Sequence, residues 1–267
     1  MLSCVCRLES CINAVHKWLS QNWLSLNPKK SEAIQFTSGR GQGRVEDIAS
    51  IAVSGVRIKP STVVKSLGVT LDGGLTFDQH IANVCKASYF HIRALRHVRK
   101  SLPDDVAKTV ACSIVGSRID YCNALLVGMS DSNFAKLQRV QNTLARVVLG
   151  LRKFEHITPA LIELHWLPVK QRVTFKLATL TMKTIHSGQP TYLRDLVNAY
   201  EPVRTLRSSS QHLLCVGRTR TVTAARSFRH SSATIWNSLP AEIRDCTAVD
   251  NFKRKLKTHL FKLAFAA

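Results

Sequence analysis

Residues 78–100 read DQHIANVCKASYFHIRALRHVRK, and this stretch decides the fold class of the chain. Apolar or small side chains recur at the three- and four-residue spacing of one helical face: Ile81, Val84, Cys85, Ser88, Ile92 and Leu95. The other faces carry mostly cationic side chains, together with His97: Lys86, Arg93, Arg96, Arg99 and Lys100. The pattern predicts a long amphipathic helix with a buried apolar stripe and a basic exposed side.

Two further helices are predicted directly downstream. One begins at Pro103, whose missing N–H costs nothing in a first turn, and two acidic residues follow where the helix dipole favours them. The next has Ser130 or Asp131 as its N-cap, carries one apolar stripe and ends at Gly150. Three successive helices predict a bundle.

The flanking regions carry weaker patterns. Upstream, a helix is predicted over residues 8–25, followed by short β-type runs that suggest a small antiparallel patch: 33–37, 56–59 and 63–71. Downstream, shorter helices are predicted around residues 158–165, 169–186, 191–198, 224–238 and 248–263. The tail over residues 252–265 is amphipathic and basic, so it either covers a core edge or lies along a phosphate backbone. We therefore expect a mostly helical α+β fold.

The charge of the chain indicates a polyanionic partner. There are 38 Lys and Arg residues against 17 Asp and Glu, which gives a formal charge of +21. No acidic residue lies between Glu201 and Glu242, although six arginines gather there: Arg204, Arg207, Arg218, Arg220, Arg226 and Arg229. Such a segment repels itself unless a polyanion lies beside it, and nucleic acid is the commonest polyanion inside cells.

The cysteines and the apolar runs indicate an intracellular protein, nuclear or cytoplasmic. None of the eight cysteines forms a CxxC pair, no run reaches the roughly 18 apolar residues of a membrane span, and the amino terminus lacks a secretory pattern. A zinc knuckle built from Cys4, Cys6, Cys11 and His16 is the weaker reading, because its spacing is unusual and overlaps the first helix. We expect no metal site, no membrane partner and no small-molecule substrate.

Catalytic motifs are scarce. Asp104-Asp105 is one of two acidic doublets, but a two-metal site needs carboxylates from separate strands, so the doublet is better explained as a helix start. The sequence contains no G-x-S-x-G, P-loop or H-E-x-x-H motif.

Eight stretches together carry a family signature. They are WLSQNWLSLNPKKSEAIQF (18–36), KSLGVTLDGGLTFDQHI (65–81), RIDYCNALLVG (118–128), LQRVQNTLARVVLG (137–150), HITPALIELHWLPVKQRVTFK (156–176), PTYLRDLV (190–197), IWNSLPAEIRD (235–245) and FKRKLKTHLFKLAF (252–265). In type and order they resemble the carboxy-terminal part of reverse transcriptases from non-LTR (LINE-type) retrotransposons, in the jockey and chicken-repeat group. The resemblance covers nearly the whole chain.

The resemblance implies three parts. Residues 1–75 would be a remnant of the polymerase palm with a primer-grip-like hairpin at Leu67, Gly68 and Val69. Residues 76–152 would form a helical thumb-like domain, and residues 153–267 a basic, mainly helical region. Lys30 matches a lysine that is a candidate for protonating pyrophosphate in the intact enzyme, and here it would be vestigial.

The resemblance also implies a limited activity. The intact family is an RNA-directed DNA polymerase that uses Mg²⁺, held by an upstream aspartate and an Ala-Asp-Asp turn, and this sequence contains neither. We expect a truncated reading frame that begins at an internal methionine, holds no cofactor of its own and binds nucleic acid without polymerising.

The partners implied are RNA, an RNA–DNA hybrid or DNA, and a full-length reverse transcriptase of the element. The candidate nucleic-acid-binding residues are Arg93, Arg96, Arg99, Lys100, Arg204, Arg207, Arg218, Arg220, Arg226, Arg229, Lys253, Arg254 and Lys257. Two alternatives stay open: a host-used nucleic-acid-binding or protein-interaction module derived from such an element, and a structural helical domain whose basic face contacts acidic proteins.

Overall fold

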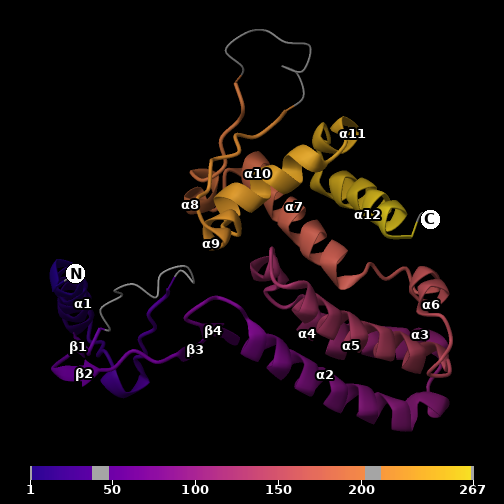
Figure 1. Ribbon diagram of the computed structural model, residues 1–267, viewed down its shortest axis with the longest axis horizontal. Helices are drawn as coiled ribbons and strands as arrows, with labels where there is room; N and C mark the ends of the chain where they lie inside the picture. The colour runs from indigo at the N-terminus through magenta and orange to yellow at the C-terminus, as the bar shows by residue number, and fades with distance from the viewer. Residues whose placement is uncertain (1, 38–47, 202–211, 266–267) are drawn as a thin grey trace. The chain divides into compact units, whose positions relative to one another are not determined.

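The computed structural model describes residues 2–37, 48–201 and 212–265 (Figure 1). The described chain is mostly helical with two small antiparallel hairpins, so the expected α+β class is confirmed. It divides into two compact units, Met1–His80 and Ile81–Ala267. The division into three parts at residues 75/76 and 152/153 stays a prediction, as does the likeness to a palm and a thumb.

The first unit opens with helix α1 (Leu2–Gln21), which begins and ends earlier than the 8–25 expected from the sequence. The Glu9 carboxylate accepts a hydrogen bond of 2.8 Å from the Ala52 N–H and so connects α1 to strand β1 (Ile51–Val53). Strand β2 (Val56–Ile58) pairs with β1 through the two-residue turn Ser54-Gly55, and both turn residues have positive φ. That backbone matches the twist of a tight hairpin.

The second hairpin corrects one expectation. The run 63–71, taken as a single stretch of β-structure, is divided into β3 (Val63–Ser66) and β4 (Val69–Asp72) by a turn at Leu67 and Gly68. These turn residues have φ of 46° and 84°, and glycine is the residue that enters this region most easily. Leucine is not a usual turn residue, so the β-type pattern did not reveal the turn, although the family resemblance implies a hairpin at Leu67, Gly68 and Val69.

The expected strand over residues 33–37 is wrong. Among the described residues, its one bridge joins Ile34 to Ser61, and the Thr37 N–H donates to the Gly73 carbonyl, which lies in a loop, at 2.9 Å. The predicted antiparallel patch is therefore two separate two-stranded sheets. An apolar run shows that a segment is suited to a strand, but a strand forms only where a partner lies alongside.

A carboxylate and an imidazole organise the link from β4 into the next helix. Asp72 accepts backbone hydrogen bonds from Gly74, Thr76 and Phe77 at 3.2, 2.8 and 2.7 Å. Partial burial raises the pKa of Asp72, but these hydrogen bonds outweigh it and leave the pKa below its usual 3.8. The buried His80 accepts the Thr70 N–H at Nδ1, and burial lowers the pKa of this imidazole.

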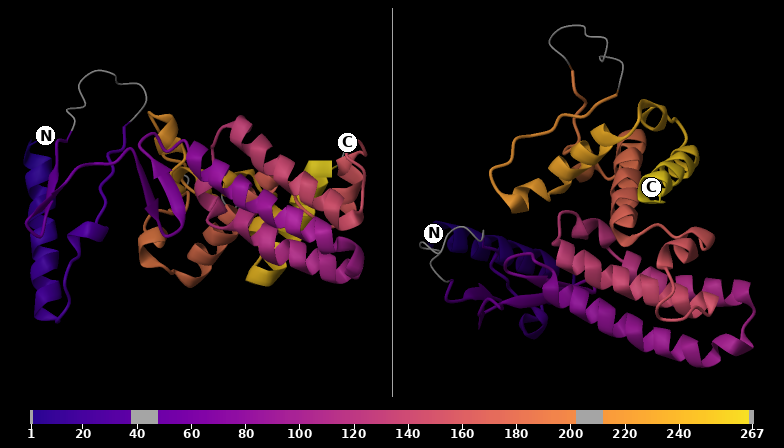
Figure 2. Two further views of the ribbon diagram at one scale, coloured as in Figure 1. Left: turned by 90° about the horizontal axis from the view of Figure 1, so that it is seen from below. Right: turned by 45° about the vertical axis from the view of Figure 1, so that its right-hand side comes forward.

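The second unit begins with the predicted bundle. Helix α2 (Asp78–Val98) runs on into a short 3-10 helix at Arg99–Ser101, and α3 (Asp104–Ala111) continues through a π-helical turn into α4 (Ser117–Asp120). Helix α5 (Asp131–Leu149) has Ser130 as its N-cap and ends at Gly150 in the left-handed conformation, as predicted. Figures 1 and 2 show α2 and α5 side by side, and their buried residues make the bundle core: Ile81, Ile92, Leu95, Leu137, Val140, Leu144 and Val148.

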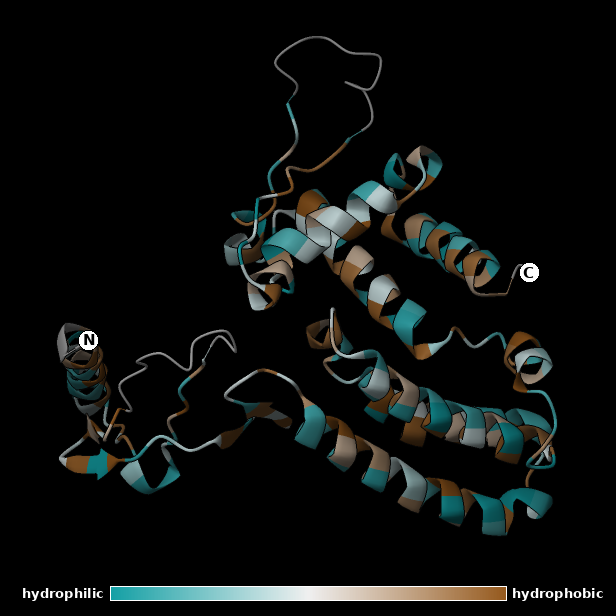
Figure 3. Ribbon diagram, in the orientation of Figure 1, coloured by the Kyte–Doolittle hydropathy of each residue, from teal (hydrophilic) through white to brown (hydrophobic). Residues whose placement is uncertain are grey.

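A second apolar cluster lies further along the chain. The elements here are α6 (Ile157–Glu163), α7 (Val169–Ser187), α8 (Thr191–Arg194), α9 (Val222–Ala225), α10 (Phe228–Ser238), α11 (Ala241–Arg244) and α12 (Val249–Phe265). Trp236 of α10 stacks on Phe252 of α12 with ring centroids 5.7 Å apart. Apolar and polar residues alternate along α12 in Figure 3, and its Phe252, Leu256 and Leu260 are buried. The tail helix therefore covers a core, the first of the two roles expected for it.

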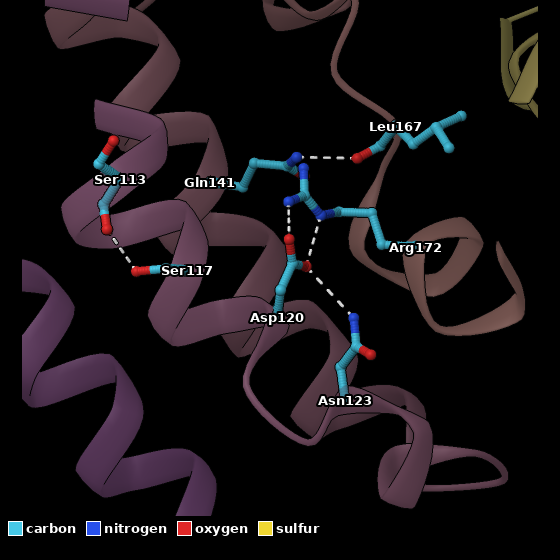
Figure 4. A network of polar contacts seen from close by, with 7 residues as sticks. All are labelled: Ser113, Ser117, Asp120, Asn123, Gln141, Leu167 and Arg172. Atoms are coloured by element: carbon cyan, nitrogen blue, oxygen red, sulfur yellow. Dashed lines mark hydrogen bonds and ion pairs between the residues drawn. The ribbon is translucent and has the colours of Figure 1, made fainter. Parts of the chain in front are cut away.

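An ion pair joins the bundle to α7 (Figure 4). The Arg172 guanidinium donates hydrogen bonds to both carboxylate oxygens of Asp120, with 2.7 Å between Nε and Oδ1. The Asn123 side-chain amide donates to the same carboxylate at 3.2 Å. Beside it, the Gln141 amide donates to the Leu167 carbonyl at 2.8 Å. These side chains fix the start of α7 against α4 and α5.

Candidate nucleic-acid interface

A basic groove lies where α2 and α5 end. It encloses about 640 Å³ and its walls carry five cationic side chains: Arg96, Arg99, Lys100, Arg146 and Lys153. None of the residues that line it in the described chain is acidic. Both helices present their carboxyl ends here, where the helix dipole stabilises cations. Helix stability therefore explains part of this positive charge, and the contacts of each side chain show which cations are engaged by the fold.

Arg99 serves the fold. Its Nε donates to the Val148 carbonyl at 2.7 Å, its Nη1 donates to the Leu102 carbonyl at 2.9 Å, and its Nη2 pairs with Asp104. These bonds satisfy carbonyls at helix ends and tie α2 to α5. Arg99 therefore forms part of the wall of the groove and contributes charge to it, while most of its donors are already engaged.

Arg146 has a buried nitrogen without a partner in the described part of the chain. Its Nη2 donates to the Glu155 carbonyl at 3.2 Å, whereas its Nε is buried and has no hydrogen-bond partner among the described residues. Buried donors in folded proteins are nearly always satisfied, by protein, water or ligand. Because this Nε has almost no accessible surface, it is not the part of Arg146 that an anion in the groove would meet.

Three cations complete the groove. Arg96 and Lys100 are exposed, and no hydrogen bond or ion pair engages either side chain within the described part of the chain. Lys153 lies 5.8 Å from the Phe154 ring centroid, a weak cation–π contact that leaves the ammonium exposed. These side chains are free to meet phosphates.

The structure separates the other candidate residues by role. Arg93, Arg218, Arg220, Arg229 and Lys257 are exposed, Lys253 pairs with Asp250, and Arg254 donates to Asn251. Arg226 is structural, because its Nε donates to the Val127 carbonyl at 3.1 Å and its chain packs on Gly128. Arg204 and Arg207 lie outside the described residues.

Arg146 and Lys153 were missed by the sequence analysis. Arg146 lies in the last turn of α5, where cations are common for helix stability alone, and Lys153 lies in the turn that follows the helix. Only their position with Arg96 and Lys100 shows that they line one groove.

In the first unit, Leu67 and Gly68 form the exposed tip of the β3–β4 hairpin, and the Leu67 side chain is 88% exposed. Val69 is buried, and Lys30 is exposed at the end of a short 3-10 helix over Pro28–Lys30. Asp104 and Asp105 occupy the first turn of α3, as the helix-start interpretation predicts.

Cys4, Cys6 and Cys11 are exposed free thiols on α1. In the described residues, no three His, Cys, Asp or Glu side chains are placed to share a metal ion. None of the helices in the same ranges has the length and apolar character needed to cross a membrane.

No protein-family model, curated protein or solved structure matches the chain.

Proposed function

We propose that the chain binds the phosphate backbone of nucleic acid through the basic groove and belongs to a non-LTR retrotransposon reverse transcriptase, of which it is a part that does not polymerise by itself. The observation that carries the proposal is the gathering of five cations in one hollow, of which Arg96, Lys100 and Lys153 are exposed. The order of sequence motifs shared with that family supports it.

The charge arrangement favours contacts to phosphate over contacts to bases. Arginine and lysine side chains on two helix ends reach backbone oxygens, which position a nucleic acid but carry no sequence information. Since Arg99 is engaged by the fold, four cations remain for phosphates. Four contacts predict a slope of log affinity against log salt of about −3.6 on duplex DNA and about −2.8 on a single strand.

The lack of polymerase activity follows from electrostatics. Two-metal phosphoryl transfer needs carboxylates that hold both ions near the reacting oxygens. Asp104 and Asp105 are adjacent on one helix, and Asp104 is paired with Arg99. We expect no primer extension by the purified chain with Mg²⁺ or Mn²⁺, and extension above a mock purification would contradict this part of the proposal.

The binding test is a salt titration by fluorescence anisotropy with duplex DNA, single-stranded RNA and an RNA–DNA hybrid. The groove variant carries Arg96→Gln, Lys100→Gln and Lys153→Gln. The control variant carries Lys176→Gln, Lys183→Gln and Lys262→Gln, which removes the same charge from exposed sites on α7 and α12. The loss of three phosphate contacts lowers the magnitude of the duplex slope by about 2.7 in the groove variant. An equal decrease in both variants would refute the groove as the site.

The alternative is a host-used module whose basic groove contacts acidic protein. Competition separates the two, because polyglutamate matches the charge of nucleic acid but lacks its regular phosphate spacing. Full displacement of duplex DNA by polyglutamate at equal charge concentration would favour the alternative.

A further inference from the structure

A second hollow lies within unit 2, far along the sequence from the basic groove, and its walls are mostly apolar. It encloses about 260 Å³. The apolar wall is formed by the end of α7, by α10 and by the segment after residue 212: Met182, Ile185, Leu214 and Trp236. This volume is slightly below the range typical of small-molecule pockets.

The wall of this hollow is held by specific hydrogen bonds. The Trp236 indole donates to the His212 carbonyl at 2.8 Å. The Asn237 side chain bonds both backbone groups of Leu214, with 2.9 Å for the N–H and 2.8 Å for the carbonyl. Two side chains of α10 therefore fix the extended segment that closes one side of the hollow.

The hollow also contains a charge that lacks a partner. Arg244, the last residue of α11, lines it and is only 8% exposed. Its Nε and Nη1 are buried, and neither has a hydrogen-bond partner within the described ranges. Arginine stays protonated in proteins, so it cannot escape the cost of burial by losing its charge. A buried charge without a counter-ion is strongly unfavourable.

The neighbouring acid forms no ion pair with this arginine in the described part of the chain. Asp245 is the acidic residue among those that line the hollow, and its Oδ1 lies 2.9 Å from the His212 Nδ1. Nε and Nη1 have almost no accessible surface, so a molecule in the hollow does not reach these two atoms. An anion inside the hollow would still supply the missing counter-charge to the guanidinium.

We propose that this hollow binds a small monocarboxylate, whose apolar body packs on Trp236, Met182 and Ile185 and whose carboxylate meets the Arg244 guanidinium. The single arginine balances one negative charge. A dianion such as phosphate would add a second charge beside Asp245 and would gain nothing from the apolar walls. The site shares no residue with the basic groove, so failure of one proposal would not affect the other.

The test uses the full chain and three probes in calorimetric titration. Hexanoate has the charge and the apolar body, hexan-1-ol has the body alone, and inorganic phosphate has charge alone. We expect saturable one-to-one binding of hexanoate, about tenfold or more tighter than hexan-1-ol, with no binding of phosphate. Equal affinity for hexanoate and hexan-1-ol, tighter binding of phosphate, or a hexanoate Kd weaker than about 10 mM would overturn the proposal.

A pair of variants locates the binding. Arg244→Met removes the charge and keeps the side-chain length, so the preference for hexanoate over hexan-1-ol falls below about twofold. Arg229→Met, at an exposed position on α10, keeps the preference. Without ligand, Arg244→Met also raises Tm, because it removes an unpaired buried charge. If Arg244→Met still preferred hexanoate over hexan-1-ol, or had a lower Tm than the unaltered chain, the assignment of the site to Arg244 would be wrong. The comparison of the three probes uses the unaltered chain, so it does not depend on the folding of any variant.

Discussion

The ion pair between Asp120 and Arg172 should contribute measurably to the stability of unit 2. The two side chains are 38% and 24% exposed, and the pair is bidentate. Exposed ion pairs contribute about 0.2–1 kcal/mol, whereas removal of one partner of a buried pair costs about 3–5 kcal/mol. A half-buried pair lies between these limits, so we expect a coupling free energy of about 2 kcal/mol.

A double-mutant cycle measures this coupling. The variants are Asp120→Asn, Arg172→Met and their combination, and the free energy of unfolding comes from urea denaturation followed by circular dichroism. Asp120→Asn is the costlier single change, because it leaves a guanidinium partly buried and unpaired. The double variant should be more stable than the sum of the single effects predicts.

An exposed pair in the same unit provides the matched control. Lys170 and Asp131 are 3.4 Å apart, with side chains that are 69% and 92% exposed. The equivalent cycle with Lys170→Met and Asp131→Asn should give less than about 0.5 kcal/mol, and it should vanish in about 0.5 M salt. Equal couplings for the two pairs, or a coupling between Asp120 and Arg172 that disappears in salt, would refute the reasoning that burial strengthens the bond.

Three further predictions concern unit 1. Asp72→Ala removes the acceptor of three backbone N–H groups and should destabilise the link between β4 and α2 by about 1–2 kcal/mol, measured by hydrogen exchange. Because the pKa of Asp72 is lowered in the folded chain, its stabilisation is complete above pH 3.8 and is lost as the pH falls through the lowered pKa; a flat acid response of the unaltered chain would contradict this. Burial also lowers the pKa of His80 from 6.5, so stability should decrease as the pH drops below 6.5, where the unfolded chain takes up the proton first. The measurement is the hydrogen exchange of the Thr70 amide as a function of pH, corrected for the intrinsic exchange rate. His80→Gln should remove the pH dependence of this protection, and an unchanged dependence would show that another titrating group causes it. At the β3–β4 turn, Leu67→Asn should stabilise the hairpin and Gly68→Ala should destabilise it by about 1 kcal/mol, because both positions have positive φ and asparagine tolerates it better than leucine. Cross-strand NMR contacts between Ser66 and Val69 would report the change, and opposite signs would exclude this turn geometry.

Elements that depend on near neighbours could be predicted from the sequence alone. The spacing of apolar residues in 78–100 is repeated every turn, and Ser130 and Gly150 set the ends of α5 through bonds within a few residues. The same local signals placed Asp104 and Asp105 in a helix start. Such features are recoverable because their causes lie within one or two helical turns.

Strand pairing and the roles of charged residues were decided by the tertiary structure. Residues 33–37 have a suitable strand pattern but find no neighbouring strand in the described part of the chain, and the turn at Leu67 and Gly68 divides a run whose β-type pattern looks continuous. Arg226 looks like a free cation in the sequence, yet it donates to the carbonyl of Val127, 99 positions away in the chain.

The groove and the hollow depend on the same long-range packing. Arg96 and Arg146 are fifty residues apart and line one groove because α2 and α5 end at the same place. Arg244 resembles any other arginine of a basic chain until folding buries it beside Trp236. The sequence gives directly the type and charge of each residue. Burial and hydrogen-bond partners are established only when distant segments come together, because desolvation and hydrogen bonding depend on distance in space and not on distance along the chain.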